Sequence, residues 1–209
     1  MGFYSKYILP KMIHLVCRAE VNTKQREKVV PHARGRVLEI GAGSGLNLPF
    51  YDASRVSHLS ALEPSAEIWS IAEPAVREAE FAVDFIQASA ETIPLDSDSI
   101  DTVLVTYTLC SIPSAEKALR EMRRVLRPDG ELVFCEHGIA PDESVRKWQN
   151  RLNPVWKRFA GGCNLNRDIP GLFEGNGFHL GNVETMYLPG LKPMSFNYWG
   201  SAKKSQPDP

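Results

Sequence analysis

The sequence predicts an α/β protein whose core is a doubly wound, mostly parallel β-sheet. From Arg36 onward, short apolar runs rich in β-forming residues alternate with stretches of helical periodicity, and repeated units of this length form parallel sheets. The first apolar run ends in glycines at positions 41, 43 and 45, which is how a buried strand brings its backbone to a small ligand. The chain has 209 residues, 43% of them hydrophobic and 23% charged, so one globular domain with a buried core is expected.

The alternation of apolar runs with helical periodicity predicts the strands and helices in the central part of the chain. Ser65 and Asp142 are expected helix N-caps, and the segment from Arg127 to Gly130 is expected to form a turn before the next strand. The expected strands are residues 36–41, 58–63, 82–87, 100–107 and 130–136, and the expected helices are residues 65–79, 114–127 and 142–152.

The two ends of the chain carry other patterns. Helical pieces precede the first strand, and Asp168 is expected to cap a short helix near the other end. The expected segments are an N-terminal helical lid over residues 1–34, with helices at 10–17 and 21–30, a sheet domain over 35–204 that closes with antiparallel strands at 178–188 and 195–203, and a frayed tail over 205–209.

Charge is unevenly distributed along the chain. Residues 1–36 carry eight Lys or Arg and two Glu, which gives +6, whereas the rest of the chain sums to −7. The basic segment either contacts an anionic membrane surface or forms an ordinary solvated helical face, and both interpretations remain open. Nucleic acid is not an expected partner, because no basic patch is interleaved with aromatic residues. No transmembrane helix is expected, because no run of about 18 apolar residues occurs.

The four cysteines are Cys17, Cys110, Cys135 and Cys163, and they are widely separated. They form neither a CxxC pair nor a spacing typical of zinc ligands. We therefore expect reduced thiols in a cytoplasmic protein, and no metal.

The glycine loop separates two classes of cofactor. A dinucleotide site has the spacing G-x-G-x-x-G, but here the third glycine comes one residue earlier, which disfavours a pyrophosphate. Glu63 lies 18 residues past Gly45, at the end of the second strand, and is suited to accept hydrogen bonds from ribose hydroxyls. A glycine-rich turn without ligand, an NAD-binding oxidoreductase and a plain surface carboxylate at Glu63 remain alternatives.

With Glu39 before it, this loop resembles motif I of the class I S-adenosylmethionine-dependent methyltransferases. The resemblance covers residues 36–136. It implies a Rossmann-like, seven-stranded sheet of order 3-2-1-4-5-7-6, with S-adenosyl-L-methionine as cofactor and S-adenosyl-L-homocysteine as product. Glu63 would hold the ribose, and residues 88–93 would cover the adenine. The positions that the resemblance assigns to the cofactor are Glu39, Gly41, Gly43, Gly45, Asn47, Glu63, Pro64, Ser89, Ala90, Glu91 and Thr106.

Further segments resemble a narrower group, the methyltransferase-like 7 thiol S-methyltransferases and their bacterial relatives. This resemblance implies methyl transfer to a small lipophilic thiol. Phosphatidylethanolamine N-methyltransferases and ubiquinone or menaquinone C-methyltransferases share the core, so N- and C-methylation remain alternatives. The segments that carry the resemblance are residues 108–111, 124–130, 135–137, 148–149, 154–156 and 161–168.

The same resemblance implies which residues meet the methyl acceptor. An already ionised thiol needs positioning and desolvation more than a base, although His137 could accept a proton near neutral pH. Structural roles for Cys110 and His137, and core packing for the wall residues, remain alternatives. The implied residues are Tyr107, Cys110 and His137 at the transfer site, Trp156, Cys163, Asn164 and Arg167 in the acceptor wall, and Tyr4 and Tyr7 in the lid.

Eukaryotic members of the group carry a long hydrophobic N-terminal anchor, whereas this chain has a short basic segment. We therefore expect a cytoplasmic monomer or homodimer, with peripheral membrane contact through residues 1–36 left open.

Overall fold

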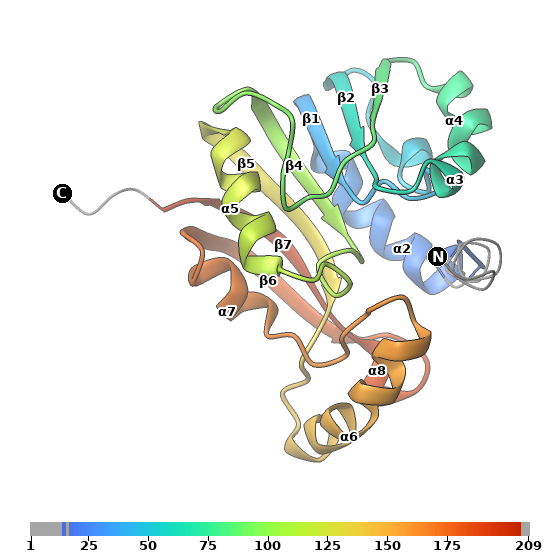
Figure 1. Cartoon of the computed structure of the whole chain (residues 1–209), viewed down its shortest axis with the longest axis vertical. Coiled ribbons are helices and arrows are strands. Elements are labelled where there is room, and N and C mark those ends of the chain that lie inside the picture. The colour runs from blue at the N-terminus through green and yellow to red at the C-terminus, as the bar shows by residue number, and fades with distance from the viewer. Residues whose placement is uncertain (1–13, 16, 206–209) are drawn as a thin grey trace.

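The computed structural model describes residues 14, 15 and 17–205, and its centre is a seven-stranded sheet of order β3-β2-β1-β4-β5-β7-β6 (Figure 1). Strands β1 to β5 run parallel, whereas β7 pairs antiparallel with both β5 and β6. The expected strand order is confirmed. The strands are β1 (Gly35–Ile40), β2 (Val56–Leu62), β3 (Ala82–Ile86), β4 (Ile100–Thr106), β5 (Leu126–His137), β6 (Phe178–Tyr187) and β7 (Phe196–Lys204).

The central strands are apolar on both faces because each face lies under a helical layer. Leu38 of β1 belongs to the same buried cluster as Leu119 of α5 (Ala115–Val125). The preceding residue, Val37, belongs to a second cluster with Val29 of α2 (Glu20–Val29). Successive residues of a strand point to opposite faces, so a strand covered on both sides must be apolar throughout. The one charged side chain in this part of β1, Glu39, is therefore conspicuous.

The remaining helices are short, except for α6. Asp168 caps α7 as expected, because its carboxylate accepts a hydrogen bond from the Gly171 amide at 3.1 Å. The helices are α3 (Ala66–Trp69), α4 (Glu73–Glu78), α6 (Glu143–Phe159), α7 (Ile169–Glu174) and α8 (Lys192–Ser195), with 3₁₀ helices η2 (Val30–His32), η3 (Leu48–Phe50) and η4 (Ser70–Ala72).

The single helix expected over residues 65–79 is broken in the structure. α3 ends at Trp69, η4 follows, and α4 begins with Glu73 and Pro74. Proline has no amide hydrogen to donate to the preceding turn, so the regular helix is interrupted there. The expected cap is confirmed, because the Ser65 hydroxyl accepts a hydrogen bond from the Ile68 amide at 3.2 Å.

Helix α6 continues seven residues beyond its expected end at 152 and passes through Pro154. Tertiary contacts made by residues just before the proline hold the helix in place. The buried Gln149 amide donates to the carbonyls of Gly138 and Leu165, at 2.9 Å each. The Asn153 side chain accepts a hydrogen bond from the Leu165 amide at 2.8 Å. These tertiary contacts offset the backbone hydrogen bond that the proline cannot make.

One further expectation was wrong, and another was met only in part. The turn expected over residues 127–130 lies inside β5, where Leu126 pairs with Ile100 and a register shift follows. Leu126 is fully buried, so it keeps its place in the sheet while the next residues bulge. Asp142 is the N-cap residue of α6, as expected, but its side chain makes no capping hydrogen bond, and its carboxylate instead accepts one from the Tyr187 hydroxyl.

The ends of the chain are described only in part. α2 confirms the helix expected over residues 21–30. Most of the helix expected over residues 10–17, together with residues 206–209 of the expected tail, lies outside the described residues. Within the described residues, no helix is both long enough and apolar enough to cross a bilayer.

Candidate functional site

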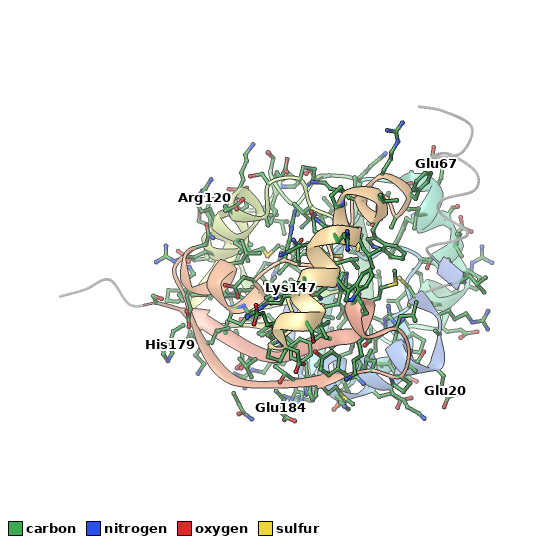
Figure 2. All side chains as sticks on the ribbon, turned by 90° about the horizontal axis from the view of Figure 1, so that it is seen from below. Glu20, Glu67, Arg120, Lys147, His179 and Glu184 are labelled. Carbon is green, nitrogen blue, oxygen red and sulfur yellow. The ribbon has the colours of Figure 1, made fainter. Side chains whose placement is uncertain are left out.

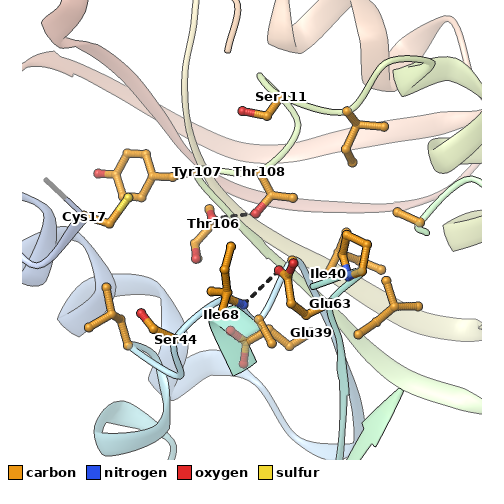
Figure 3. Close-up of a pocket in the computed structure, with 18 of the residues that line it drawn as sticks. Cys17, Glu39, Ile40, Ser44, Glu63, Ile68, Thr106, Tyr107, Thr108 and Ser111 are labelled. Atoms are coloured by element: carbon orange, nitrogen blue, oxygen red, sulfur yellow. Dashed lines mark hydrogen bonds between the residues drawn. The ribbon is translucent and has the colours of Figure 1, made fainter. Parts of the chain in front are cut away.

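A cavity of about 340 Å³ lies at the carboxyl ends of β1, β2 and β4 (Figure 3). The sheet reverses its strand order between β1 and β4, and ligands of doubly wound folds bind at this point. Nine of the eleven positions expected to hold a cofactor line the cavity. They are Glu39, Gly41, Gly43, Asn47, Glu63, Pro64, Ser89, Ala90 and Thr106.

The three glycines after β1 have different structural roles. All three have positive φ, with values of 65° at Gly41, 54° at Gly43 and 74° at Gly45. A Cβ atom on Gly41 would lie 2.4 Å from the Thr108 side chain, and one on Gly45 would lie 2.6 Å from Ala72. A Cβ atom on Gly43 would meet nothing closer than 3.7 Å. Gly45 therefore packs against η4 outside the cavity lining, whereas Gly43 leaves space that a ligand can occupy.

Glu39 is held in a buried polar network at the base of the cavity. Its carboxylate accepts hydrogen bonds from the Asn47 amide at 2.8 Å and the Tyr51 hydroxyl at 2.7 Å. Asn47 also donates to Thr106 Oγ1 at 2.9 Å, and its own Oδ1 is buried with no partner among the described residues. Burial raises the pKa of Glu39 to about 7, against the opposing effect of both hydrogen bonds. Asn47 lines the cavity, so a ligand ammonium or hydroxyl would be a suitable partner for this free acceptor.

Glu63 follows β2 and presents its carboxylate to the cavity. It accepts a hydrogen bond from the main-chain amide of Gly43 at 3.1 Å (Figure 3). It accepts a second from the main-chain amide of Ser65 at 3.0 Å. Burial raises its pKa, and the two amide hydrogen bonds oppose that shift. Each oxygen of a carboxylate has two lone pairs, so one remains on each for a ligand hydroxyl.

The segment after β3 contributes main chain and small side chains. Ser89 and Ala90 line the cavity, but Glu91 does not. The Glu91 carboxylate instead accepts a hydrogen bond from the Ser114 amide at 2.7 Å, at the start of α5. The geometry therefore gives Glu91 a structural role.

Arg26 of α2 is a cavity residue that the sequence pattern did not single out. Its side chain is 4% exposed and lines the cavity. It donates to the Cys17 carbonyl at 2.7 Å and lies 5.4 Å from the centre of the Tyr107 ring. Among the described residues no carboxylate pairs with it, and its Nε has no partner. A buried guanidinium with no carboxylate at salt-bridge distance favours an anionic ligand group. Only its place on the buried side of α2 could have identified it.

Of the predicted lid residues that the structure describes, three reach the cavity. His14, Cys17 and Arg26 all line it, and His14 Nδ1 lies 2.6 Å from Ser44 Oγ in the glycine loop. Tyr4 and Tyr7, also expected in the lid, lie outside the described residues.

Tyr107 is the only one of the three expected transfer-site residues that lines the cavity. Its φ of 52° places the backbone in the left-handed region, which a non-glycine residue adopts rarely. The buried Glu136 carboxylate holds the loop that follows, accepting hydrogen bonds from the amides of Thr108 at 2.6 Å and Leu109 at 3.0 Å. Burial, with the Cys135 thiol nearby, raises the pKa of the Tyr107 phenol well above its usual value. Tyr107 therefore stays protonated and does not act as a base at neutral pH.

Cys110 and His137 meet a third predicted residue, Cys163, behind the cavity wall. His137 Nε2 lies 3.2 Å from Cys163 Sγ. The two thiols and the imidazole offer ligand atoms that all lie within 4.8 Å of one another. A hydrogen bond with Cys110, together with burial, raises the pKa of the Cys163 thiol. Burial raises the pKa of the Cys17 thiol too, and Cys163 is near enough to add to that shift.

None of the predicted wall residues lines the cavity, and two of them, Asn164 and Arg167, join two loops. The Asn164 side chain and main-chain amide donate to the Cys110 carbonyl at 2.8 and 2.9 Å. The Arg167 guanidinium donates to the carbonyls of Leu109 and Ile112. Trp156 lies on α6, partly buried, and also outside the cavity lining. The segment over residues 161–167 is thus tied to the loop after β4.

Comparison with known proteins places this geometry among methyltransferases. A family model described as a methyltransferase domain matches residues 38–134. The human thiol S-methyltransferase TMT1A is 34% identical over 72% of this chain and 63% of its own length. The phosphatidylethanolamine N-methyltransferase of Cereibacter sphaeroides is 32% identical over 64% of this chain and 70% of its own length. A crystal structure from Bacillus halodurans, described as a putative methyltransferase, shares the fold with a TM-score of 0.70 at 14% identity, covering 88% of this chain and 99% of that one. The chain thus spans a little under two thirds of the human relative.

Proposed function

Because the chain belongs to the family of class I S-adenosylmethionine-dependent methyltransferases, we propose that it transfers the methyl group of S-adenosylmethionine to a small lipophilic thiol. The choice of a thiol as the methyl acceptor rests on the 34% identity with the human thiol S-methyltransferase, over 72% of this chain. We also propose that the enzyme is cytoplasmic and is a monomer or a homodimer.

The cavity fits the three parts of the cofactor. The Glu63 carboxylate retains acceptor capacity for two ribose hydroxyls, which is a specific match for a vicinal diol. Ile68 and Ala90 offer apolar surface to an adenine ring. The unpartnered Asn47 Oδ1 suits the ammonium of the methionine part, and the unpaired Arg26 guanidinium suits its carboxylate.

The chain's contribution to the reaction is positioning and exclusion of water. S-adenosylmethionine, when bound, supplies a methyl group on a sulfonium, which a nucleophile displaces in line. Tyr107 remains protonated and can orient an acceptor without removing a proton. A thiol that ionises near neutral pH needs no enzymatic base, so the side chains have only to hold it against the methyl group in a desolvated site.

The N-terminal segment completes the site in this proposal. Residues 1–34 form a lid whose described part already meets the glycine loop through His14 and Ser44. Lid closure over the cofactor would exclude water from the methyl group during transfer.

A second candidate is N-methylation of phosphatidylethanolamine. It is favoured by the charge of +6 over residues 1–36 and by the 32% identity with the bacterial phosphatidylethanolamine N-methyltransferase. A basic segment beside the cavity would bring the enzyme to an anionic lipid surface. C-methylation of a quinone-type acceptor is left as an outcome of the test.

The test is methyl transfer from isotope-labelled S-adenosylmethionine. Aliphatic and aromatic thiols, phosphatidylethanolamine vesicles and a reduced quinone are offered in parallel. Labelled thioether from the thiols alone supports the proposal. Labelled lipid or quinone without labelled thioether contradicts it and selects the corresponding alternative.

A further inference from the structure

The three-residue cluster of Cys110, His137 and Cys163 lies beside the proposed transfer site, yet the methyl-transfer geometry described above makes no use of it. Its members come from three separate places: the loop after β4, the last residue of β5, and the loop between α6 and α7. Their sequence separations of 27 and 26 residues match no linear zinc motif, which is why the spacing of the cysteines predicted no metal. Only the fold brings them together.

The donor set has the chemistry of a zinc site. It consists of two sulfurs and one imidazole nitrogen, with no carboxylate, which disfavours calcium and magnesium. Two thiolates would neutralise the charge of a zinc ion. Ligands at about 2.0 and 2.3 Å from a tetrahedral zinc lie about 3.5 Å apart. His137 Nε2 and Cys163 Sγ are 3.2 Å apart, so they can meet a common ion after a small adjustment.

The backbone around the cluster is fixed. The Cys110 carbonyl accepts two hydrogen bonds from Asn164, the residue next to Cys163. Arg167 holds the flanking carbonyls of Leu109 and Ile112. Two loops that each carry one sulfur are thus locked to each other, and such outer contacts fix ligand positions in metal sites.

The cluster has three ligands and borders the cavity. Among the residues that the structure describes, no fourth ligand atom belongs to the group. Three protein ligands with one open position are typical of catalytic zinc sites. Cys110 Sγ lies 3.4 Å from Ser111 Oγ, and Ser111 lines the cavity, as does Gly161 two residues before Cys163.

We propose that Cys110, His137 and Cys163 bind a zinc ion whose open coordination position takes the sulfur of the acceptor thiol. This inference rests on the proposed thiol methylation. It adds that the zinc ion activates the acceptor thiol for that reaction. Zinc displaces the protons of both cysteine thiols to solvent on binding. The acceptor loses its thiol proton to solvent as its sulfur binds the zinc, and it remains a thiolate at neutral pH.

The rest of the step balances without another reagent. A sulfur lone pair of the zinc-bound acceptor forms the new sulfur–methyl bond. The old methyl–sulfonium bond breaks, and its electron pair stays on the sulfur of the cofactor product. The resulting thioether is neutral and a weaker ligand than a thiolate. It therefore dissociates from the zinc, and the open coordination position can bind the next acceptor.

The test uses cobalt(II) as a spectroscopic substitute for zinc in reduced, metal-free full-length protein. We expect tetrahedral d–d absorption and sulfur-to-cobalt charge transfer from two thiolates. Cys110→Ser and Cys163→Ser should each remove one thiolate contribution, and His137→Asn should weaken cobalt binding more than about tenfold, because even outer-shell changes cost that much. Cys17→Ser is the matched control and should leave the spectrum intact.

Further readouts separate the parts of the proposal. Zinc competition against a chromophoric chelator measures affinity on the wild-type protein, independently of any variant's folding. Adding an aromatic thiol to the cobalt protein should increase the charge-transfer band, whereas the corresponding thioether should not.

Several results would overturn the zinc site. They are a spectrum unchanged in both serine variants, no cobalt or zinc binding by the reduced protein, or a Cys110–Cys163 disulfide in the protein as isolated with no metal binding after reduction. Loss of one thiolate contribution in Cys17→Ser would show a closed, four-ligand site and overturn the open position. Cobalt binding without thiol methylation would leave the metal site standing, but it would refute the proposed function and with it the binding of an acceptor thiol at the open position. Thiol methylation by protein that binds no metal would refute the zinc site alone.

Discussion

Two charged side chains, Glu63 and Arg26, line the cavity and have hydrogen-bonding capacity that no described residue uses. Glu63 has two main-chain donors fixed on it, and Arg26 has no carboxylate partner among the described residues. Burying a charge without compensation is costly, so such residues usually meet a ligand. Both can be tested by ligand binding alone, without knowledge of the methyl acceptor.

Replacing Glu63 with glutamine should weaken S-adenosylhomocysteine binding about tenfold to a hundredfold, because hydrogen bonds to a charged group contribute about 1.5–3 kcal/mol. Titration calorimetry measures the change. Glu78→Gln is the matched control, since Glu78 is exposed on α4 and away from the cavity. Equal affinities for the wild type and Glu63→Gln would remove the ribose role.

Replacing Arg26 with methionine should discriminate between two nucleosides. S-adenosylhomocysteine carries a carboxylate and methylthioadenosine does not, so the variant should lose about tenfold or more in affinity for the first and little for the second. Competition binding with both ligands gives the ratio. An equal loss for both would mean that Arg26 supports the fold of the lid and not the carboxylate.

Glu39 makes the stability of the ligand-free protein depend on pH. Its folded-state pKa of about 7 lies above the ordinary value of 4.5, so folding favours its protonated form. Its contribution to stability is fully present below pH 4.5 and is lost as the pH rises to 7. The free energy involved is at most about 3 kcal/mol.

Glu39→Gln cannot titrate and should flatten this dependence. Urea unfolding at pH 5 and at pH 8 should show a smaller difference in free energy for the variant than for the wild type. Identical differences in the two proteins would show that Glu39 is ionised at both pH values.

At the scale of elements, two glycines of the loop after β1 have different roles. Gly41 is needed for packing within the fold, and Gly43 leaves space for the ligand. Gly41 and Gly43 have nearly the same φ, 65° and 54°, so alanine imposes a similar backbone strain of about 1–2 kcal/mol at each. Only at Gly41 does the new Cβ also strike a neighbour, Thr108, at 2.4 Å.

Gly41→Ala should therefore lower the melting temperature clearly more than Gly43→Ala does. Gly43→Ala should instead weaken cofactor binding, and Gly43→Asp should abolish it by filling the ligand space. Thermal unfolding and titration calorimetry on the three variants test this. Wild-type cofactor affinity in Gly43→Asp would contradict the assignment of the loop.

The elements also show why some features could be predicted and others could not. The parallel strands follow from largely apolar runs such as Val37 to Ile40, which Glu39 alone interrupts, because a strand covered on both faces has a purely local signature. The break near Pro74 and the persistence of α6 through Pro154 depend on tertiary contacts, which periodicity does not contain. The meeting of Cys110 with Cys163 likewise depends on how two distant loops are fastened.

At the scale of the whole molecule, the cavity joins two layers of the core. It is lined by α2 on one side, by the ends of three parallel strands and by the loop before α5. A ligand bound there contacts segments separated by most of the sheet domain. Ligand binding should therefore stabilise the molecule as a unit rather than one loop of it.

Saturating S-adenosylhomocysteine, at about 100 times its Kd, should stabilise the fold by about 2.7 kcal/mol. For a domain of this size the expected rise in Tm is about 5–10 °C. Differential scanning calorimetry should show one transition that moves as a whole. Two transitions, of which only one moves, would mean that the ligand holds a separate part of the chain.

The antiparallel insertion of β7 between β5 and β6 has a consequence for how the chain is made. During translation β6 leaves the ribosome before β7, and within the part of the chain that the structure describes β7 is its only neighbour in the sheet. Until β7 follows, β6 presents both of its hydrogen-bonding edges to solvent and to other nascent chains, the arrangement from which strands aggregate. Polar, exposed side chains such as His179 and Glu184, at the outer edge of the molecule (Figure 2), make the strand a poor partner for its own copies. The same side chains thus protect the chain both during its synthesis and afterwards, when one edge of β6 stays open in the finished sheet.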